Sequence, residues 1–223
     1  MIANNIAIIA NICYCLCQIS LFKNLVSKMP TDLNKSQILE NLELLSEWLS
    51  VKYPDDTFEL VVVGGAAMAL DEIKNQTKDI DLLFPETLPT VLKEGIAHVS
   101  RAKRLPLEWI NTNAANIFKK IRLPEGLPKY FNNISRTIEI GDNLKITLIG
   151  RQALISMKLL ASTPSYIKHT DDIKSLNPRK EEIEEAIRFV LSIDNDELRK
   201  EDLRIVLNTI GFDFNEFTKN NKR

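Results

Sequence analysis

Residues 58–84 constrain the fold more than any other stretch of the chain, because two short apolar runs flank a helix-forming segment. The β-branched run 60–63 predicts a buried strand. Gly64 and Gly65 end this run, and the good helix formers of 66–73 predict a helix that leaves the glycines directly. After a polar loop, residues 79–84 predict a second strand. The predicted unit is therefore strand, glycine turn, helix, loop and strand.

Two aspartates in the second strand suggest its chemistry. Side chains alternate along a strand, so Asp79 and Asp81 point to one face and Ile80 points to the other. Two carboxylates on one face repel each other. In a strand that is otherwise buried, this repulsion is unfavourable unless cations lie between the carboxylates. Such hard oxygen ligands suit Mg²⁺ or Mn²⁺. The alternative is a pair of solvated carboxylates at a strand end.

The Gly64–Gly65 turn adds a candidate phosphate site. The amides at the start of the predicted helix face an anion, and glycine lets a phosphate approach the backbone closely. A phosphate site beside a divalent-metal site is the equipment for phosphoryl or nucleotidyl transfer. A Gly-Gly pair alone is often only a turn, but its order relative to the aspartates makes the combination more specific.

The Gly-Gly pair followed by Asp79-Ile80-Asp81 resembles the signature of the DNA polymerase beta-like nucleotidyltransferase superfamily. Within it, the run NQTKDIDLL at 75–83 is most similar to the AbiEii-type toxin and related minimal nucleotidyltransferase branch, which often reads R-x-T-x-D-I-D-L. Thr77 and both aspartates match this pattern, whereas Asn75 stands where arginine is expected. The clear similarity covers 57–84 and 144–176.

The resemblance implies nucleotidyl transfer from a nucleoside triphosphate to an acceptor hydroxyl of RNA, a protein or a small molecule. Asp79 and Asp81 would be catalytic and would hold two Mg²⁺ ions, or Mn²⁺. The residues implied to bind the nucleotide are Gly64, Gly65, Thr77 and Lys158. The resemblance also implies a toxin-type enzyme with an antitoxin as a partner.

A third carboxylate is expected, because members of this superfamily usually take one from a later strand of the same sheet. Residues 137–149 predict two strands around a Gly-Asp-Asn turn. Glu139 is the best-placed candidate, as a metal ligand or base, and Asp142 is the second. The alternative for Glu139 is an exposed strand residue without a catalytic role.

Lys158 interrupts the apolar end of a helix predicted at 150–161. This helix resembles the L-x-x-x-K-L-x-A helix of AbiEii-type enzymes, in which the lysine approaches the phosphates and stabilises charge on the leaving pyrophosphate. The alternative is a surface lysine that extends its ammonium group into water. Downstream, residues 168–176 are similar to a K-D-x-x-D segment of the same branch, and Asp172 aligns with its second aspartate.

The charge of the whole chain indicates no particular partner, since 29 Lys and Arg residues are balanced by 30 Asp and Glu residues. Residues 101–129 are basic. They predict either a patch for a triphosphate or RNA backbone or an ordinary solvated surface. The segment 107–111 resembles a W-[hydrophobic]-N segment of the toxin branch, with Thr112 where an acidic residue is expected. Trp109 is predicted to be a core residue.

Residues 1–28 form an apolar leader. The first 22 are uncharged and long enough to span a bilayer, but they contain Asn and Gln and follow no positive charge. Three interpretations are open: a weak membrane anchor, a packed N-terminal helix, or an over-extended start of the coding sequence. The last is favoured, and it would make Met29 the first residue of the protein. Cys13, Cys15 and Cys17 lack zinc-site spacing. With no cysteine elsewhere, a cytoplasmic protein without disulfides is expected.

The predicted fold is therefore α/β (α+β), with a small mixed sheet that carries Asp79, Asp81 and Glu139. The predicted regions are the leader at 1–28, a nucleotidyltransferase core at 29–150 and a C-terminal helical region at 151–223. Further helices are expected at 31–49, 87–99, 180–191 and 196–209. The rival function is a catalytically inactive nucleotidyltransferase-fold module that binds a partner, which the departures at Asn75 and Thr112 favour.

Overall fold

The computed structural model describes residues 32–121 and 126–218. They lie within one compact unit, Asp32–Arg223, so the predicted core and the helical region after residue 150 belong to the same unit. The predicted leader at 1–28, with its three cysteines, and the predicted helix start at Thr31 lie outside the described residues. In the part of the chain that is described, no helix combines the length and the apolar character needed to cross a membrane.

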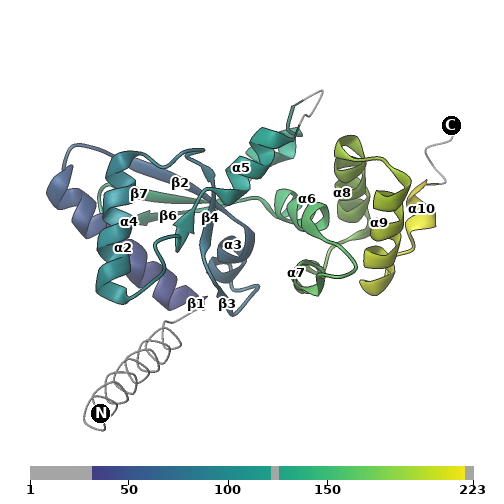
Figure 1. The fold of residues 1–223 in the computed structure, drawn as a ribbon, viewed down its shortest axis with the longest axis horizontal. Coiled ribbons are helices and arrows are strands. Elements are labelled where there is room, and N and C mark those ends of the chain that lie inside the picture. The colour runs from purple at the N-terminus through teal and green to yellow at the C-terminus, as the bar shows by residue number, and fades with distance from the viewer. Residues whose placement is uncertain (1–31, 122–125, 219–223) are drawn as a thin grey trace, which may run out of the picture. The chain divides into compact units, whose positions relative to one another are not determined.

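Five strands form a mixed sheet in the order β5-β4-β2-β7-β6 (Figure 1). The central strand β2 pairs antiparallel with β4 and parallel with β7. The short strand β5 adds to β4 in parallel, and β6 adds to β7 as the antiparallel partner of a hairpin. The strands are β2 (Phe58–Val63), β4 (Ile80–Phe84), β5 (Ile110–Asn111), β6 (Ile134–Ile140) and β7 (Leu144–Ile149).

This architecture confirms the predicted α/β class with a mixed sheet. A separate two-stranded sheet pairs β1 (Leu33–Asn34) with β3 (Gln76–Thr77). The helices are α2 (Lys35–Lys52), α3 (Gly64–Leu70), α4 (Thr90–Lys103), α5 (Asn113–Lys120), α6 (Arg151–Ala161), α7 (Ile167–Leu176), α8 (Lys180–Ile193), α9 (Glu197–Thr209) and α10 (Phe214–Thr218), with a 3₁₀ turn at Lys129–Asn132.

Helix α2 illustrates how local sequence signals become packing. Asn34 caps it, accepting a hydrogen bond from the backbone of Gln37, whose side chain accepts one from the backbone of Asn34 in return. The apolar stripe predicted from helical spacing is the buried face, with Ile38, Leu42, Leu45 and Leu49 fully covered. Helix α2 packs against α4. Trp109, predicted to be a core residue, is buried.

The end of α6 is tied to α9 by one arginine. The buried guanidinium of Arg199 donates hydrogen bonds to the carbonyl groups of Leu159, Leu160 and Ser162. The last carbonyls of a helix have no partners within the helix, so Arg199 satisfies groups that would otherwise be buried without a hydrogen bond. The helix that carries Lys158 therefore ends in a fixed position.

Candidate functional site

The two aspartates of the D-x-D motif lie at the start of β4, beside the end of β2. Asp79 directly precedes the strand and Asp81 is its second residue, paired with Val63. Gly64 follows with a φ of 67°, a backbone conformation that favours glycine. A Cβ atom at Gly64 would lie 3.2 Å from Asp81 Oδ2. Glycine is therefore needed here both for the turn and for the close approach of the carboxylate.

Thr77 contacts both the loop that carries Asp79 and the glycine turn. A Cβ atom at Gly65 would lie 2.6 Å from Thr77 Oγ1, so helix α3 and strand β3 touch at this point. The threonine is buried, and its hydroxyl donates a hydrogen bond of 3.1 Å to the carbonyl of Asp79. These contacts describe a side chain that holds the aspartate loop in shape. A contact between Thr77 and a nucleotide stays a prediction.

Asn111 is a site residue that the sequence did not reveal. It pairs with Asp81 across β4 and β5, and its Nδ2 donates to Asp79 Oδ2 at 3.3 Å. The same amide donates to the carbonyl of Glu108, while Oδ1 accepts from the backbone of Asn113. The side chain is thus fixed with its N–H groups toward the carboxylates. The Trp-Ile-Asn run resembles a segment of the toxin branch, but a strand of two residues shows no period from which it could be predicted.

The electrostatic setting of Asp81 favours a cation. Burial raises the pKa of the Asp81 carboxyl and repulsion by Asp79 raises it further, against the hydrogen bond from Asn111 and the attraction of Lys158 and Lys168. The charged form of Asp81 is therefore held at a cost in the metal-free protein. A divalent cation between the two aspartates would remove that cost.

The predicted third carboxylate does not reach the pair. Glu139 lies on the edge strand β6 opposite Lys145, and β2 and β7 separate β6 from β4. Lys145 also pairs with Glu59, near the opposite end of β2 from Val63 and therefore from Asp81. From strand spacing and rise, Glu139 and Asp81 are roughly 20 Å apart.

Asp142 lies in the turn beyond β6 and is no closer, so neither candidate completes a metal site at Asp79 and Asp81. The prediction identified the correct hairpin but could not identify its distance from β4. Within residues 32–121 and 126–218, no group of three or more His, Cys, Asp or Glu side chains is placed to hold a metal ion.

Lys158 is neither a surface lysine nor an unpaired one. Its ammonium group lies 2.6 Å from Asp172 Oδ2, and both side chains are buried. Lys74 binds the other oxygen of the same carboxylate. Burial acts to raise the pKa of Asp172, but the two lysines outweigh it and the pKa lies below its usual value. Burial lowers the pKa of Lys158, and Asp172 opposes that change.

A cleft of about 570 Å³ brings these parts together. Gly64, Asp81, Lys158 and His169 line its polar part. Its apolar wall comes from α5, the residue that follows it and α6, and includes Ala114, Ile117, Phe118, Ile121, Met157 and Leu160. Acidic residues of α9 and the preceding loop, Asp194, Asp196 and Asp202, also line it. The cleft thus combines an apolar wall with charged side chains of both signs, a lining typical of small-molecule sites.

Comparison of the chain with protein-family models, with curated proteins and with solved structures gave no match.

Proposed function

We propose that the protein is a metal-dependent nucleotidyltransferase, which moves a nucleoside monophosphate from a nucleoside triphosphate to an acceptor hydroxyl of RNA, a protein or a small molecule. The observation that carries this proposal is the shared cleft. Asp81 of the D-x-D motif, Gly64 of the glycine turn and Lys158 come from three separate parts of the sequence and line one cavity. The resemblance to the AbiEii-type branch supports the same function at the same residues.

The donor groups fit Mg²⁺ or Mn²⁺. Asp79 and Asp81 offer hard carboxylate oxygens. Burial raises the pKa of Asp81 and repulsion by Asp79 raises it further, so a cation beside the pair would be favoured. Mg²⁺ is commonly held by one or two carboxylates, with water and substrate phosphates as its other ligands, so a third carboxylate is not required. When bound, the ion would neutralise charge on the phosphate oxygens and favour attack at the α-phosphorus.

The chain's own residues orient the substrate. The absence of a side chain at Gly64 leaves the backbone open to a phosphate beside Asp81. Lys158 and Lys74 each bind one oxygen of the Asp172 carboxylate, so this cluster has two positive charges and one negative charge. The one net positive charge of this lysine–aspartate cluster would stabilise charge that develops on the leaving pyrophosphate. Four aspartates also line the cleft, so the triphosphate would enter together with its metal ion. The apolar wall of the cleft accommodates the nucleoside and excludes water.

Transfer assays test this function. Purified protein is incubated with each labelled nucleoside triphosphate, Mg²⁺ or Mn²⁺, and total RNA or lysate as the source of acceptors. We expect label to move to one class of acceptor and to stay on the triphosphate with Asp79→Ala or Asp81→Ala. Glu139→Gln is the matched control, an acidic residue of the same sheet far from the pair, and should transfer at the wild-type rate. Full activity in both aspartate variants would refute the proposal.

A second candidate function has its own observation. The neighbour of the aspartates on β5 is the amide of Asn111 rather than a carboxylate, and the described residues supply no third acidic ligand. A site reduced in this way fits a module that binds a nucleotide or a protein partner, such as an antitoxin, without catalysis. Triphosphate binding in the presence of Mg²⁺ together with no transfer to any acceptor would support this alternative.

A further inference from the structure

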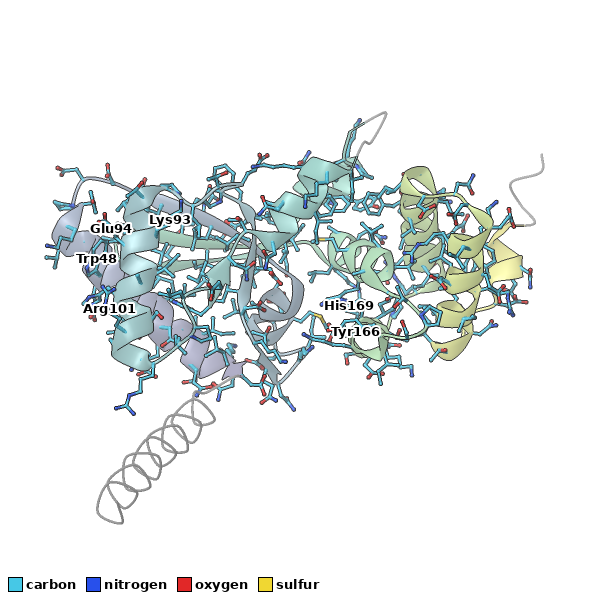
Figure 2. The ribbon with its side chains drawn as sticks, viewed as in Figure 1. Trp48, Lys93, Glu94, Arg101, Tyr166 and His169 are labelled. Carbon is cyan, nitrogen blue, oxygen red and sulfur yellow. The ribbon has the colours of Figure 1, made fainter. Side chains whose placement is uncertain are left out.

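His169 is a cleft residue that the proposed chemistry does not use. It lies in the first turn of α7 and lines the cleft together with Asp81 and Lys158. Figure 2 labels it beside Tyr166, whose ring meets the imidazole edge-on with the ring centroids 5.0 Å apart. The ring is thus half-buried, contacts an aromatic neighbour and forms part of the cleft lining.

The hydrogen bonds of this histidine are incomplete. Nδ1 is buried and, within the described residues, has no hydrogen-bond partner. Most buried polar side-chain atoms in proteins are paired, so an unpaired one in a cavity needs an explanation. Because Nδ1 is covered, Nε2 is the nitrogen left to meet a molecule in the cleft.

Partial burial and the charges around the ring keep it neutral. Burial lowers the pKa of His169 to about 4, together with the positive charges of Lys158, Lys168 and Lys74 and against the opposing effect of Asp172. A neutral imidazole has one N–H donor and one acceptor nitrogen. It is suited to an uncharged polar group, whereas gaining a proton would place another positive charge among three lysines.

We propose that His169 is a substrate-binding residue, whose Nε2 forms a hydrogen bond with an uncharged group of the nucleoside, a ribose hydroxyl or a polar atom of the base. This inference rests on the proposed function and assigns the parts of the substrate. The lysines meet the phosphates, and His169 meets the nucleoside beside the apolar wall. Proton transfer from the acceptor hydroxyl is not its role.

The chain offers a matched test because it contains two histidines. His169→Phe keeps an aromatic ring but removes both nitrogens, and His169→Gln places a neutral amide near the position of Nε2. His98→Phe is the control, since His98 is an exposed residue of α4 that stacks on Trp48 away from the cleft residues. Calorimetry measures the affinity of each protein for the non-hydrolysable α,β-methylene analogues of ATP, GTP, CTP and UTP, with Mg²⁺ present. Thermal unfolding verifies that each variant is folded.

We expect His169→Phe to bind the preferred analogue about three- to tenfold more weakly, the usual effect of losing one neutral hydrogen bond. His169→Gln should regain most of the affinity, and His98→Phe should match the wild type. The dependence of transfer on pH between 6 and 8.5 should be the same for the wild type and His169→Gln.

Equal affinity in His169→Phe and the wild type would overturn this inference alone. So would an acidic limb of the wild-type pH profile that disappears in His169→Gln, since it would identify a proton acceptor. A wild-type protein that binds none of the four analogues would overturn the proposed function and this inference together.

Discussion

Lys158 Nζ lies 2.6 Å from Asp172 Oδ2, and the two side chains are only 7% and 5% exposed. Removing one member of a buried ion pair leaves the other without compensation, which typically costs about 3–5 kcal/mol. We expect Lys158→Met to lower the free energy of unfolding by about 3 kcal/mol, at the low end because Lys74 still contacts Asp172. Chemical denaturation measures it, and the double variant Lys158→Met/Asp172→Leu should be more stable than either single one. Single variants as stable as the wild type would show that the pair contributes nothing to the fold.

Asp81→Asn should stabilise the metal-free protein and abolish Mn²⁺ binding. Because the folded-state pKa of this acid is raised, its ionisation opposes folding, so the gain in stability is present at neutral pH and disappears as the pH falls below the unfolded-state pKa. Denaturation in EDTA at pH 7 and pH 3.5 gives the stability, and paramagnetic resonance of Mn²⁺ gives the binding. Glu139→Gln is the control and should bind Mn²⁺ like the wild type. Mn²⁺ binding that survives in Asp81→Asn would contradict the assignment.

Gly65→Ala should destabilise the protein by about 1–3 kcal/mol, as expected where an added methyl overpacks its surroundings. The added methyl would lie 2.6 Å from Thr77 Oγ1. Adding Thr77→Ala removes that oxygen, so the double variant should lose less stability than the sum of the two single changes. Thermal and chemical denaturation of the wild type, the two single variants and the double variant gives the coupling energy of this double-mutant cycle. Additive losses would mean that the two residues do not meet.

The ring of His169 should titrate with a pKa of about 4, measured by NMR of the imidazole carbon resonances in the folded protein. Since this value is below that of an unfolded histidine, the neutral ring stabilises the fold above about pH 6.5, and that contribution is lost as the pH falls toward 4. His169→Gln should therefore flatten the fall in stability across this range. A midpoint near 6.5 would contradict the half-buried, positively charged surroundings of the ring.

Local patterns predicted what depends on local sequence. The run before Gly64, the strand that follows Asp79 and the hairpin around residue 141 are all present, because apolar alternation and glycine turns act over a few residues. Helix α4 begins at Thr90, directly after Pro89, and later than the predicted residue 87. Strand β5 escaped prediction because two residues show no period.

Neighbours across the sheet could not be predicted, since strand order is set by packing between distant segments. The sequence predicted the strand that carries Glu139, but not that two strands separate it from β4. For the same reason Asn111 did not stand out, although it is the residue beside Asp81. Lys158 and Asp172 each match a segment of the toxin branch, yet nothing in their spacing predicts that they form a buried ion pair.

The parallel pairing of β2 with β7 has a consequence for how the chain folds. Phe58 pairs with Leu144 and Val62 with Leu148. The central strand β2 therefore cannot pair with β7 until about 80 further residues have been synthesised. Closing such a long loop has an entropic cost before any contact compensates for it, which makes this step slow relative to helix formation. Until β7 emerges from the ribosome, one edge of the most apolar strand lacks its hydrogen-bonding partner. A nascent chain that stops before residue 144 is therefore the species most exposed to aggregation and to capture by chaperones.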